Sequence, residues 1–463
     1  RAREWVSFGA SPIRIARHLT PPDDQRPATG DTVVARSNRR MPGRQLLRSR
    51  FCDPAGRCHV LADREVGSRI PRGGDQPSGT WLQIERPRPR LTGFRFWAHY
   101  GTSASAGGCT MDIDESRLQE FMGSFMNDMG GAMTVLMVCL GDELGFYDAM
   151  ATSGPVDAAG LAEASGCNAR LAQEWLDQQA SAGYVGYDAE AGSYELPAEH
   201  AMALAHRQSP VFVAGGTIAI VAMFEDFERI AAAFRKDGAL AWGDHSPHLF
   251  RGTAEFFRPG YQHHLTSEWI PALDGVADSL ANGGAKIADV GCGHGISSVV
   301  MAQAYPEAEL HGFDFHAPSI DAAREGAGFA GVGDRVHFNV AAADAFRGEF
   351  DLICFFDCLH DMGDPVGIAT HAKTQLADGG TVMLVEPFAH SDKVTNHSLP
   401  TAKMLYGAST VVCTPNSLSQ DVGRAMGAQT GEPGMSAVFA EAGYTHFQRV
   451  AETPFNIVYE ARA

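Results

Sequence analysis

The chain has 463 residues and a formal net charge of −18 at pH 7. This length is enough for more than one domain. The longest apolar run, residues 210–224, is shorter than the roughly twenty residues that a membrane-spanning helix needs. No H-E-x-x-H or C-x-x-C pattern indicates a metal site or a disulfide framework. These features exclude a helical membrane span and a disulfide-stapled domain, and they favour a reducing, cytoplasmic compartment.

Residues 1–110 differ in composition from the rest of the chain. They hold 19 Arg, no Lys and 9 acidic residues, whereas residues 111–463 hold 18 basic and 46 acidic residues. The segment has no sustained helical or strand period and is rich in proline, so it cannot build a core. A basic nucleic-acid arm and a targeting peptide are two functional interpretations, but no apolar targeting region is present. We expect a non-native or disordered leader, a natural start at Met111, and unchanged folding when residues 1–110 are deleted.

Residues 111–200 are expected to form a small separate domain. The apolar run 132–140 predicts a buried helix, and Asn168 stands where it can cap a later one. Residues 183–187 and 193–196 predict two short strands around a turn. Helix, turn, helix and two strands in this order resemble a winged helix.

DNA binding is the first function that a winged helix suggests. A helix in the major groove faces phosphates and normally presents several Arg or Lys side chains. Residues 168–183 hold one Arg against two acidic residues. We therefore expect no nucleic-acid partner.

Residues 201–280 are expected to form a helical linker or lid that is unusually apolar for a connector. Its apolar side chains could line a substrate chamber or belong to the core. Tyr261, just before the next domain, is a candidate to cover a bound cofactor.

The segment 289–295 reads Asp-Val-Gly-Cys-Gly-His-Gly, between an apolar run and a helical stretch that starts at Ile296. A strand, a tight glycine turn and a helix form the place where open α/β sheets bind nucleotide-like ligands. The third glycine, Gly295, comes one residue too early for a dinucleotide fingerprint. An acidic residue followed by G-x-G-x-G resembles motif I of the class I S-adenosylmethionine (SAM) methyltransferases. The resemblance implies cofactor contacts from Asp289, Gly291, Cys292, Gly293 and Gly295.

Cys292 has two interpretations. It could be a reactive thiol beside a helix N-terminus. As a small residue that fills the turn, it needs no such role.

Two further acids follow at the ends of predicted strands. Residues 309–314 end in Asp314, where a carboxylate can accept both ribose hydroxyls of a nucleoside. Residues 336–340 lead to Asp344, which in the methyltransferase pattern takes the adenine amino group while apolar neighbours pack on the ring. Helix capping is the alternative role for both acids. The cofactor set that the resemblance implies is completed by Phe315, Ala345, Phe346 and Phe356. As a strand-tip acid, Asp314 is expected to lie outside the core.

Further strands are predicted at residues 350–356 and 381–385, and a late hairpin at 448–459 resembles the antiparallel seventh strand of the class I sheet. The predicted fold class is therefore α/β. We expect a Rossmann-like, seven-stranded methyltransferase sheet over residues 281–463, preceded by the helical and winged-helix part.

His360 opens a His-Asp-x-x-Asp pattern just past the fourth predicted strand. The pattern resembles O-methyltransferases in which a histidine deprotonates the substrate hydroxyl, as a neutral imidazole can. Glu386 occupies the place of the acid that orients this histidine. The family's third acid would fall near residues 429–432, where the spacing departs from the pattern. The alternative for His360 is a surface residue at a helix start.

The resemblance implies methyl transfer from SAM to a small-molecule acceptor, and the motif set is most similar to actinobacterial enzymes that act on aromatic or polyketide-like compounds. It also implies a cytoplasmic homodimer formed through the winged-helix domain, and no metal. N- or C-methylation fits the same sheet. A ligand-sensing transcription regulator that retains the fold without turnover is the alternative from another class.

Overall fold

The computed structural model describes residues 51–52, 58–59 and 113–463. The chain divides into two units, residues 1–98 and 99–463. The described residues of the first unit form the antiparallel pair β1 (Phe51–Cys52) and β2 (Cys58–His59). The predicted leader and the start at Met111 otherwise lie outside the described residues.

The first helical part of the second unit has the predicted winged-helix order. Its elements are α1 (Glu115–Glu143), α2 (Phe146–Ser153), α3 (Ala158–Ser165), α4 (Ala169–Ser181), β3 (Gly186–Asp188) and β4 (Ser193–Glu195). The Asn168 side chain accepts the backbone N–H groups of Arg170 and Leu171, which caps α4. Tyr147 and Trp175 are buried in the core of this part.

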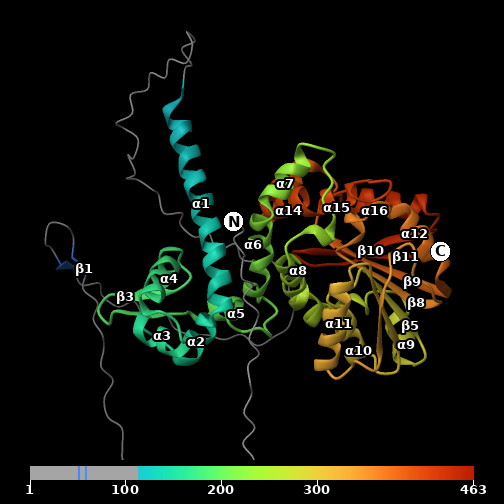
Figure 1. Cartoon of the computed structure of the whole chain (residues 1–463), viewed down its shortest axis with the longest axis horizontal. Helices are drawn as coiled ribbons and strands as arrows, with labels where there is room; N and C mark the ends of the chain where they lie inside the picture. The colour runs from blue at the N-terminus through green and yellow to red at the C-terminus, as the bar shows by residue number, and fades with distance from the viewer. Residues whose placement is uncertain (1–50, 53–57, 60–112) are drawn as a thin grey trace, which may run out of the picture. The chain divides into compact units, whose positions relative to one another are not determined.

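The prediction of a buried helix at 132–140 was only partly correct. The helix α1 extends back to Glu115, where Asp114 caps it, and it is the long blue-green helix of Figure 1. Val138 and Cys139 are buried, but Leu136 and Leu140 are exposed. The sequence period therefore located the helix without showing that one of its apolar faces has no cover among the described residues.

The connector is helical, as predicted for residues 201–280. It contains α5 (Ala198–Leu204), the 3-10 turn η1 (Ala214–Gly216), α6 (Thr217–Glu225), α7 (Phe227–Phe234), the 3-10 turn η2 (Trp242–Asp244), α8 (Pro247–Gly260), the π-helix η3 (Tyr261–Trp269) and α9 (Val276–Ala281). Among the described helices, no single one is long and apolar enough to cross a membrane, and the bent pair α1 and α2 passes that test only jointly, by length and composition.

The last part is a seven-stranded sheet. Its strands are β5 (Lys286–Val290), β6 (Glu309–Asp314), β7 (Val336–Val340), β8 (Phe350–Phe356), β9 (Leu376–Pro387), β10 (His446–Glu452) and β11 (Asn456–Arg462). The strand order is β10-β11-β9-β8-β5-β6-β7, and β11 is antiparallel to both of its neighbours. The order reverses at β5, so the carboxyl ends of β5, β6 and β8 form the crevice where such sheets bind ligands.

Both faces of this sheet are covered by helices (Figure 1). Along β8, Leu352 and Cys354 belong to one buried cluster, and Ile353 and Phe355 belong to the other. Side chains alternate between the faces of a strand, so a strand buried on both faces reads as a continuous apolar run. The helices of this part are α10 (Ile296–Ala304), α11 (Ala317–Phe329), η4 (Leu359–Asp361, 3-10), α12 (Pro365–Thr374), α13 (Lys393–His397), α14 (Ala402–Ala408), η5 (Ser409–Cys413, π), α15 (Thr414–Leu418) and α16 (Gly431–Glu441).

Candidate active site

The three glycines of the turn after β5 are needed for different physical reasons. Gly291, Gly293 and Gly295 all have positive φ, at 76°, 51° and 70°, a region that favours glycine. A Cβ on Gly295 would lie 2.6 Å from the Phe338 ring, and a Cβ on Gly291 would lie 2.9 Å from the Cys358 sulfur. A Cβ on Gly293 would meet nothing within 4 Å. The turn is therefore packed at Gly291 and Gly295 and has open space beside Gly293, where a ligand can approach the backbone.

Asp289 lies beneath this turn and is fully buried. Its Oδ2 accepts hydrogen bonds of 2.6 Å from the hydroxyls of Ser297 and Ser298. Burial raises the pKa of Asp289 to about 6. Its Oδ1 has no partner within the described residues. Asp289 therefore ties the end of β5 to the start of α10 and keeps one buried acceptor beside the turn.

Asp314 ends β6 and contacts the same turn. Its Oδ2 accepts the N–H of Gly293 at 2.9 Å, and its Oδ1 accepts the N–H of His316 at 2.8 Å. The residue is buried, which raises the pKa of its carboxyl. Asp314 was expected to lie outside the core, but it is 8% exposed, and its carboxylate holds two loops together. Each oxygen still has a second lone pair that can accept a ligand hydroxyl.

The other predicted cofactor residues lie in different surroundings. Cys292 is buried, and burial, then the charges of Asp289 and Asp314, raises the pKa of its thiol well above the usual value. This disfavours a reactive thiolate. Phe315, Asp344 and Ala345 are exposed, and Phe356 is buried beneath Tyr261, with ring centroids 5.3 Å apart.

Phe346 requires a correction. Its ring is 1% exposed and packs in the core, 5.3 Å from the Phe313 ring centroid and 6.1 Å from that of Phe350. The ring thus supports the ends of the strands from inside and offers no open face to an adenine.

His360 and Glu386 form a buried pair. His360 lies on η4 directly after β8, Glu386 lies near the end of β9, and each residue is 3% exposed. His360 Nδ1 lies 2.5 Å from Glu386 Oε2, and the His360 N–H donates to Oε1 at 3.3 Å. The alternative of a surface histidine was therefore wrong.

The charges around His360 determine its proton affinity. Burial by itself lowers the pKa of His360, but the negative charge of Glu386 and the adjacent Cys413 outweigh it, so the pKa lies well above the usual value. Burial raises the pKa of Asp361 to about 7. His360, Asp361 and Cys413 also have ligand atoms within 4.8 Å of one another, a group that could hold a metal ion. The bond from Nδ1 to Glu386 leaves Nε2 of His360 as the ring nitrogen available to another group.

Sequence reasoning missed several residues of this region. Asn456 lies on β11, 99 positions after Asp357 in the sequence, and its side-chain amide donates to Asp357 at 2.7 Å. Gln429 stands where the family's third acid was sought, and its Oε1 is buried without a partner among the described residues. No local pattern marks these positions, since Asn456 pairs with a distant strand and Gln429 donates to the Phe388 carbonyl, 41 positions away in the sequence.

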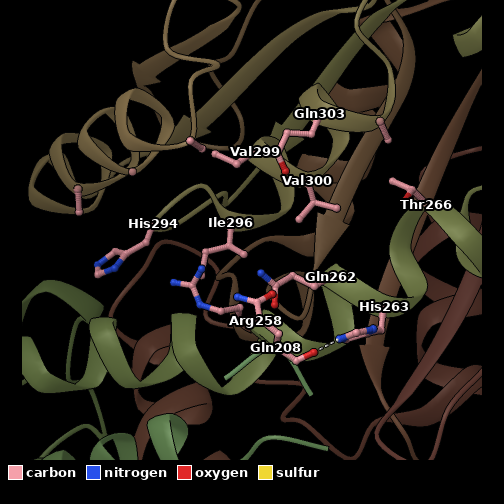
Figure 2. A pocket seen from close by; sticks show the side chains of 14 residues that line it. Gln208, Arg258, Gln262, His263, Thr266, His294, Ile296, Val299, Val300 and Gln303 are labelled. Carbon is pink, nitrogen blue, oxygen red and sulfur yellow. Dashed lines mark hydrogen bonds between the residues drawn. The ribbon is translucent and has the colours of Figure 1, made fainter. Parts of the chain in front are cut away.

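A separate cavity of about 670 Å³ lies along the outer side of α10 (Figure 2). Val299 and Gln303 line it from α10, Arg258 lines it from α8, and Gln262 lines it from η3. His294, between two glycines of the turn, also reaches it. None of the predicted cofactor or catalytic residues lines this cavity.

Comparison with known proteins supports both domains. Residues 132–206 match the Rv2258c-like winged HTH domain, and residues 261–420 match a methyltransferase domain family. Among curated proteins, a ubiquinone biosynthesis O-methyltransferase of Leptothrix cholodnii is 32% identical over 133 residues, 28% of this chain and 53% of that protein. An uncharacterised Synechococcus protein is 38% identical over 98 residues, 20% of this chain and 24% of that protein. The chain thus spans about a quarter to about half of these relatives' length.

Solved structures share the fold of about three quarters of this chain. The structure of PigF with SAH has a TM-score of 0.56 at 20% identity, and the alignment covers 74% of this chain and 99% of the PigF chain. The mitomycin 7-O-methyltransferase MmcR has a TM-score of 0.55 at 18% identity, with coverage of 76% and 100%. Human N-acetylserotonin methyltransferase in complex with SAM has a TM-score of 0.53 at 18% identity, with coverage of 76% and 99%. These likenesses concern the fold.

The chain therefore carries a winged helix-turn-helix domain followed by a methyltransferase domain with the class I fold. The predicted fold class is confirmed. SAM is the cofactor that this class of fold uses.

Proposed function

We propose that the protein transfers the methyl group of SAM to the hydroxyl of a small-molecule acceptor, with His360 as the general base. The observation that carries this proposal is the buried His360–Glu386 pair, in which His360 comes shortly after β8 and Glu386 lies near the end of the neighbouring strand β9. A histidine held by a carboxylate at the carboxyl end of a parallel strand is placed for proton transfer.

The residues around the turn fit the cofactor. Open space beside Gly293 admits a ligand to the backbone, and Asp314 keeps lone pairs for ribose hydroxyls. The proposed contacts also include Gly291, Asp344 and Phe356. SAM supplies an electrophilic methyl group on a sulfonium. The residues of the chain orient it and exclude water.

His360 acts on the acceptor. With Nδ1–H donated to Glu386, Nε2 is the atom that takes the hydroxyl proton as the oxygen attacks. The Glu386 charge then stabilises the imidazolium that forms. Because the pKa of His360 is raised, the neutral base becomes more abundant as the pH rises, and turnover should increase with pH.

Rate assays of His360→Ala and His360→Gln test the base. We expect both variants to bind SAM normally and to lose roughly 10²- to 10⁴-fold in turnover, the usual contribution of a general base. His397→Gln, at an exposed position on α13, is the control. Near-native turnover by both His360 variants would exclude this role.

A hydroxyl acceptor is favoured by the base and by the O-methyltransferases to which this chain is similar. Methylation of a neutral amine needs no proton removal before attack, whereas a phenol or an activated carbon acid must lose a proton. Incubation with isotope-labelled SAM and a panel of phenols, amines and activated carbon acids distinguishes these cases. The proposal expects His360-dependent labelling of phenols at oxygen, and labelling at nitrogen or carbon would contradict a hydroxyl acceptor.

We propose that a second copy of the chain covers α1. Exposed apolar side chains recur on this helix at steps of three and four residues, which places them on one face. They are Leu118, Phe121, Phe125, Met129, Met133, Leu136 and Leu140. Each is between 37% and 61% exposed. A seam of this spacing suits packing against a second helix.

A transcription regulator remains the second candidate, since the winged helix is present. On α4, the exposed Arg170 is paired with Glu174, which leaves little positive charge for phosphates. A gel-shift against genomic DNA fragments tests it, and specific retardation would favour the regulator. The six cysteines within residues 113–463 are free, which agrees with a cytoplasmic location.

A further inference from the structure

Asp357, the residue after β8, has an unusual backbone. Its φ is 51°, in the left-handed region that non-glycine residues rarely adopt. Its N–H donates to the Val385 carbonyl at 2.8 Å, so the neighbouring strand β9 fixes this conformation. Strained residues of this kind cluster at active sites, where the surrounding structure holds them in place.

The carboxyl of Asp357 is only half satisfied. Oδ1 accepts the Asn456 side-chain amide at 2.7 Å. Oδ2 is buried and has no hydrogen-bond partner within the described residues. An unsatisfied buried acceptor is destabilising, so a ligand donor at this point recovers free energy on binding.

The position of Asp357 is next to the glycine turn. Cys358, the following residue, lies against Gly291 and donates from its sulfur to the Val290 carbonyl at 3.4 Å. Tyr261 lies near both Asp357 and Asp289, since both carboxyls raise the pKa of its hydroxyl after burial does. Asp357 therefore lies directly before a residue that packs against the turn.

The surrounding charge favours a cation. Glu386 and Asp361 lie near Asp357, and His360 is the nearby basic side chain. Burial, and then the charge of Glu386, raises the pKa of Asp357 well above its usual value. A cationic donor beside Oδ2 would stabilise the ionised carboxylate.

We propose that Asp357 Oδ2 accepts a hydrogen bond from the ammonium group of the methionine part of SAM. The inference rests on the proposed function, because it requires SAM at the turn of Gly291 and Gly293. The ammonium is protonated at neutral pH and offers three donors, and it is present both in SAM and in the product S-adenosylhomocysteine (SAH).

Two ligands separate this contact from the rest of the site. SAH carries the ammonium, whereas 5′-methylthioadenosine has the same nucleoside and sulfur without the amino-acid end. Calorimetric titration of wild type and Asp357→Asn with both ligands isolates the contact. Asparagine can keep the bond to Asn456, tolerates the left-handed region, and places an amide donor where Oδ2 was.

We expect Asp357→Asn to weaken SAH binding roughly 10- to 100-fold, the range for a lost charge-assisted hydrogen bond, and to leave methylthioadenosine binding within twofold. Asp351→Asn, at the other end of β8, is the matched control and should change neither affinity. If Asp357→Asn does not fold, Asp357→Gly removes the carboxyl at a φ that glycine favours, and the same difference between the ligands is expected.

Equal weakening for both ligands would mean that Asp357 only supports the fold, and unchanged affinity for both would mean that it faces another group. Either result overturns the inference and leaves the proposed function standing. A wild-type protein that binds neither ligand would overturn both.

Discussion

Replacement of Glu386 by Gln tests the catalytic pair without changing its shape. The two side chains are 4% and 5% exposed, so solvent screens their interaction little. A hydrogen bond between charged groups contributes about 1.5–3 kcal/mol. At about 1.36 kcal/mol per tenfold change in rate, Glu386→Gln should lower kcat/KM roughly 10- to 150-fold while SAM affinity is retained.

The pH dependence of kcat/KM shows in which direction Glu386 shifts the pKa of His360. Glu386 raises the pKa of His360, so at low pH the base is protonated and inactive, and kcat/KM rises as the pH approaches that pKa. Gln carries no charge, so the pKa of His360 should fall and the rising limb should move to lower pH. At a pH above the pKa that His360 has in the wild type and in the variant, the base is neutral in both proteins. The rate difference that remains there measures orientation and imidazolium stabilisation.

The assay is kcat/KM against pH for wild type and Glu386→Gln. Glu441→Gln, which breaks an exposed ion pair with Arg424, serves as the control and should leave the profile unchanged. A Glu386→Gln profile with native height and an unmoved limb would refute the reasoning that Glu386 tunes His360.

Two further predictions concern the turn and the dimer. Gly293→Val should fold with a loss of about 1–2 kcal/mol from its left-handed φ, but lose SAM and SAH binding because the side chain fills open space. Gly295→Val has the same backbone strain and its side chain also meets Phe338, so it should lower the free energy of unfolding by roughly 2–5 kcal/mol. Titration and thermal melts separate the two variants, and an equal loss of stability would count against the distinction. The double variant Phe121→Glu and Phe125→Glu should be a folded monomer in sedimentation at micromolar concentration, where the wild type is a dimer. Glu120→Gln, at an exposed position, is the control and should remain a dimer. A monomeric wild type would contradict the proposed interface.

The sheet could be predicted closely from the sequence. Strands 309–314, 336–340 and 350–356 have the predicted bounds. Residues 350–356 form an apolar run that is buried on both faces, whereas in 336–340 buried and exposed side chains alternate, as expected for an edge strand. The prediction 381–385 was too short. β9 begins at Leu376, and the two glycines at positions 379 and 380 are the reason why the sequence did not indicate this earlier start. The register of β9 against β8 shifts between Phe350 and Leu352.

The site was predictable only where local patterns carry it. Gly291, Gly293 and the acid Asp314 follow spacing rules, and the structure brings them to one turn. The bond between Asp357 and Asn456 joins two distant strands, and the left-handed φ of Asp357 depends on β9. Such features arise from sheet topology, which a local period does not encode.

The central claim, a SAM site at the ends of β5 and β6, is tested most directly by calorimetric titration of SAM and SAH into wild type and folded Asp314→Ala. Thermal melts establish folding first, because Asp314 also holds the N–H groups of Gly293 and His316. We expect wild type to bind both ligands, and the variant to bind both roughly 10²-fold more weakly, since two charge-assisted bonds to the ribose are lost. Native affinity of folded Asp314→Ala for both ligands would contradict the account.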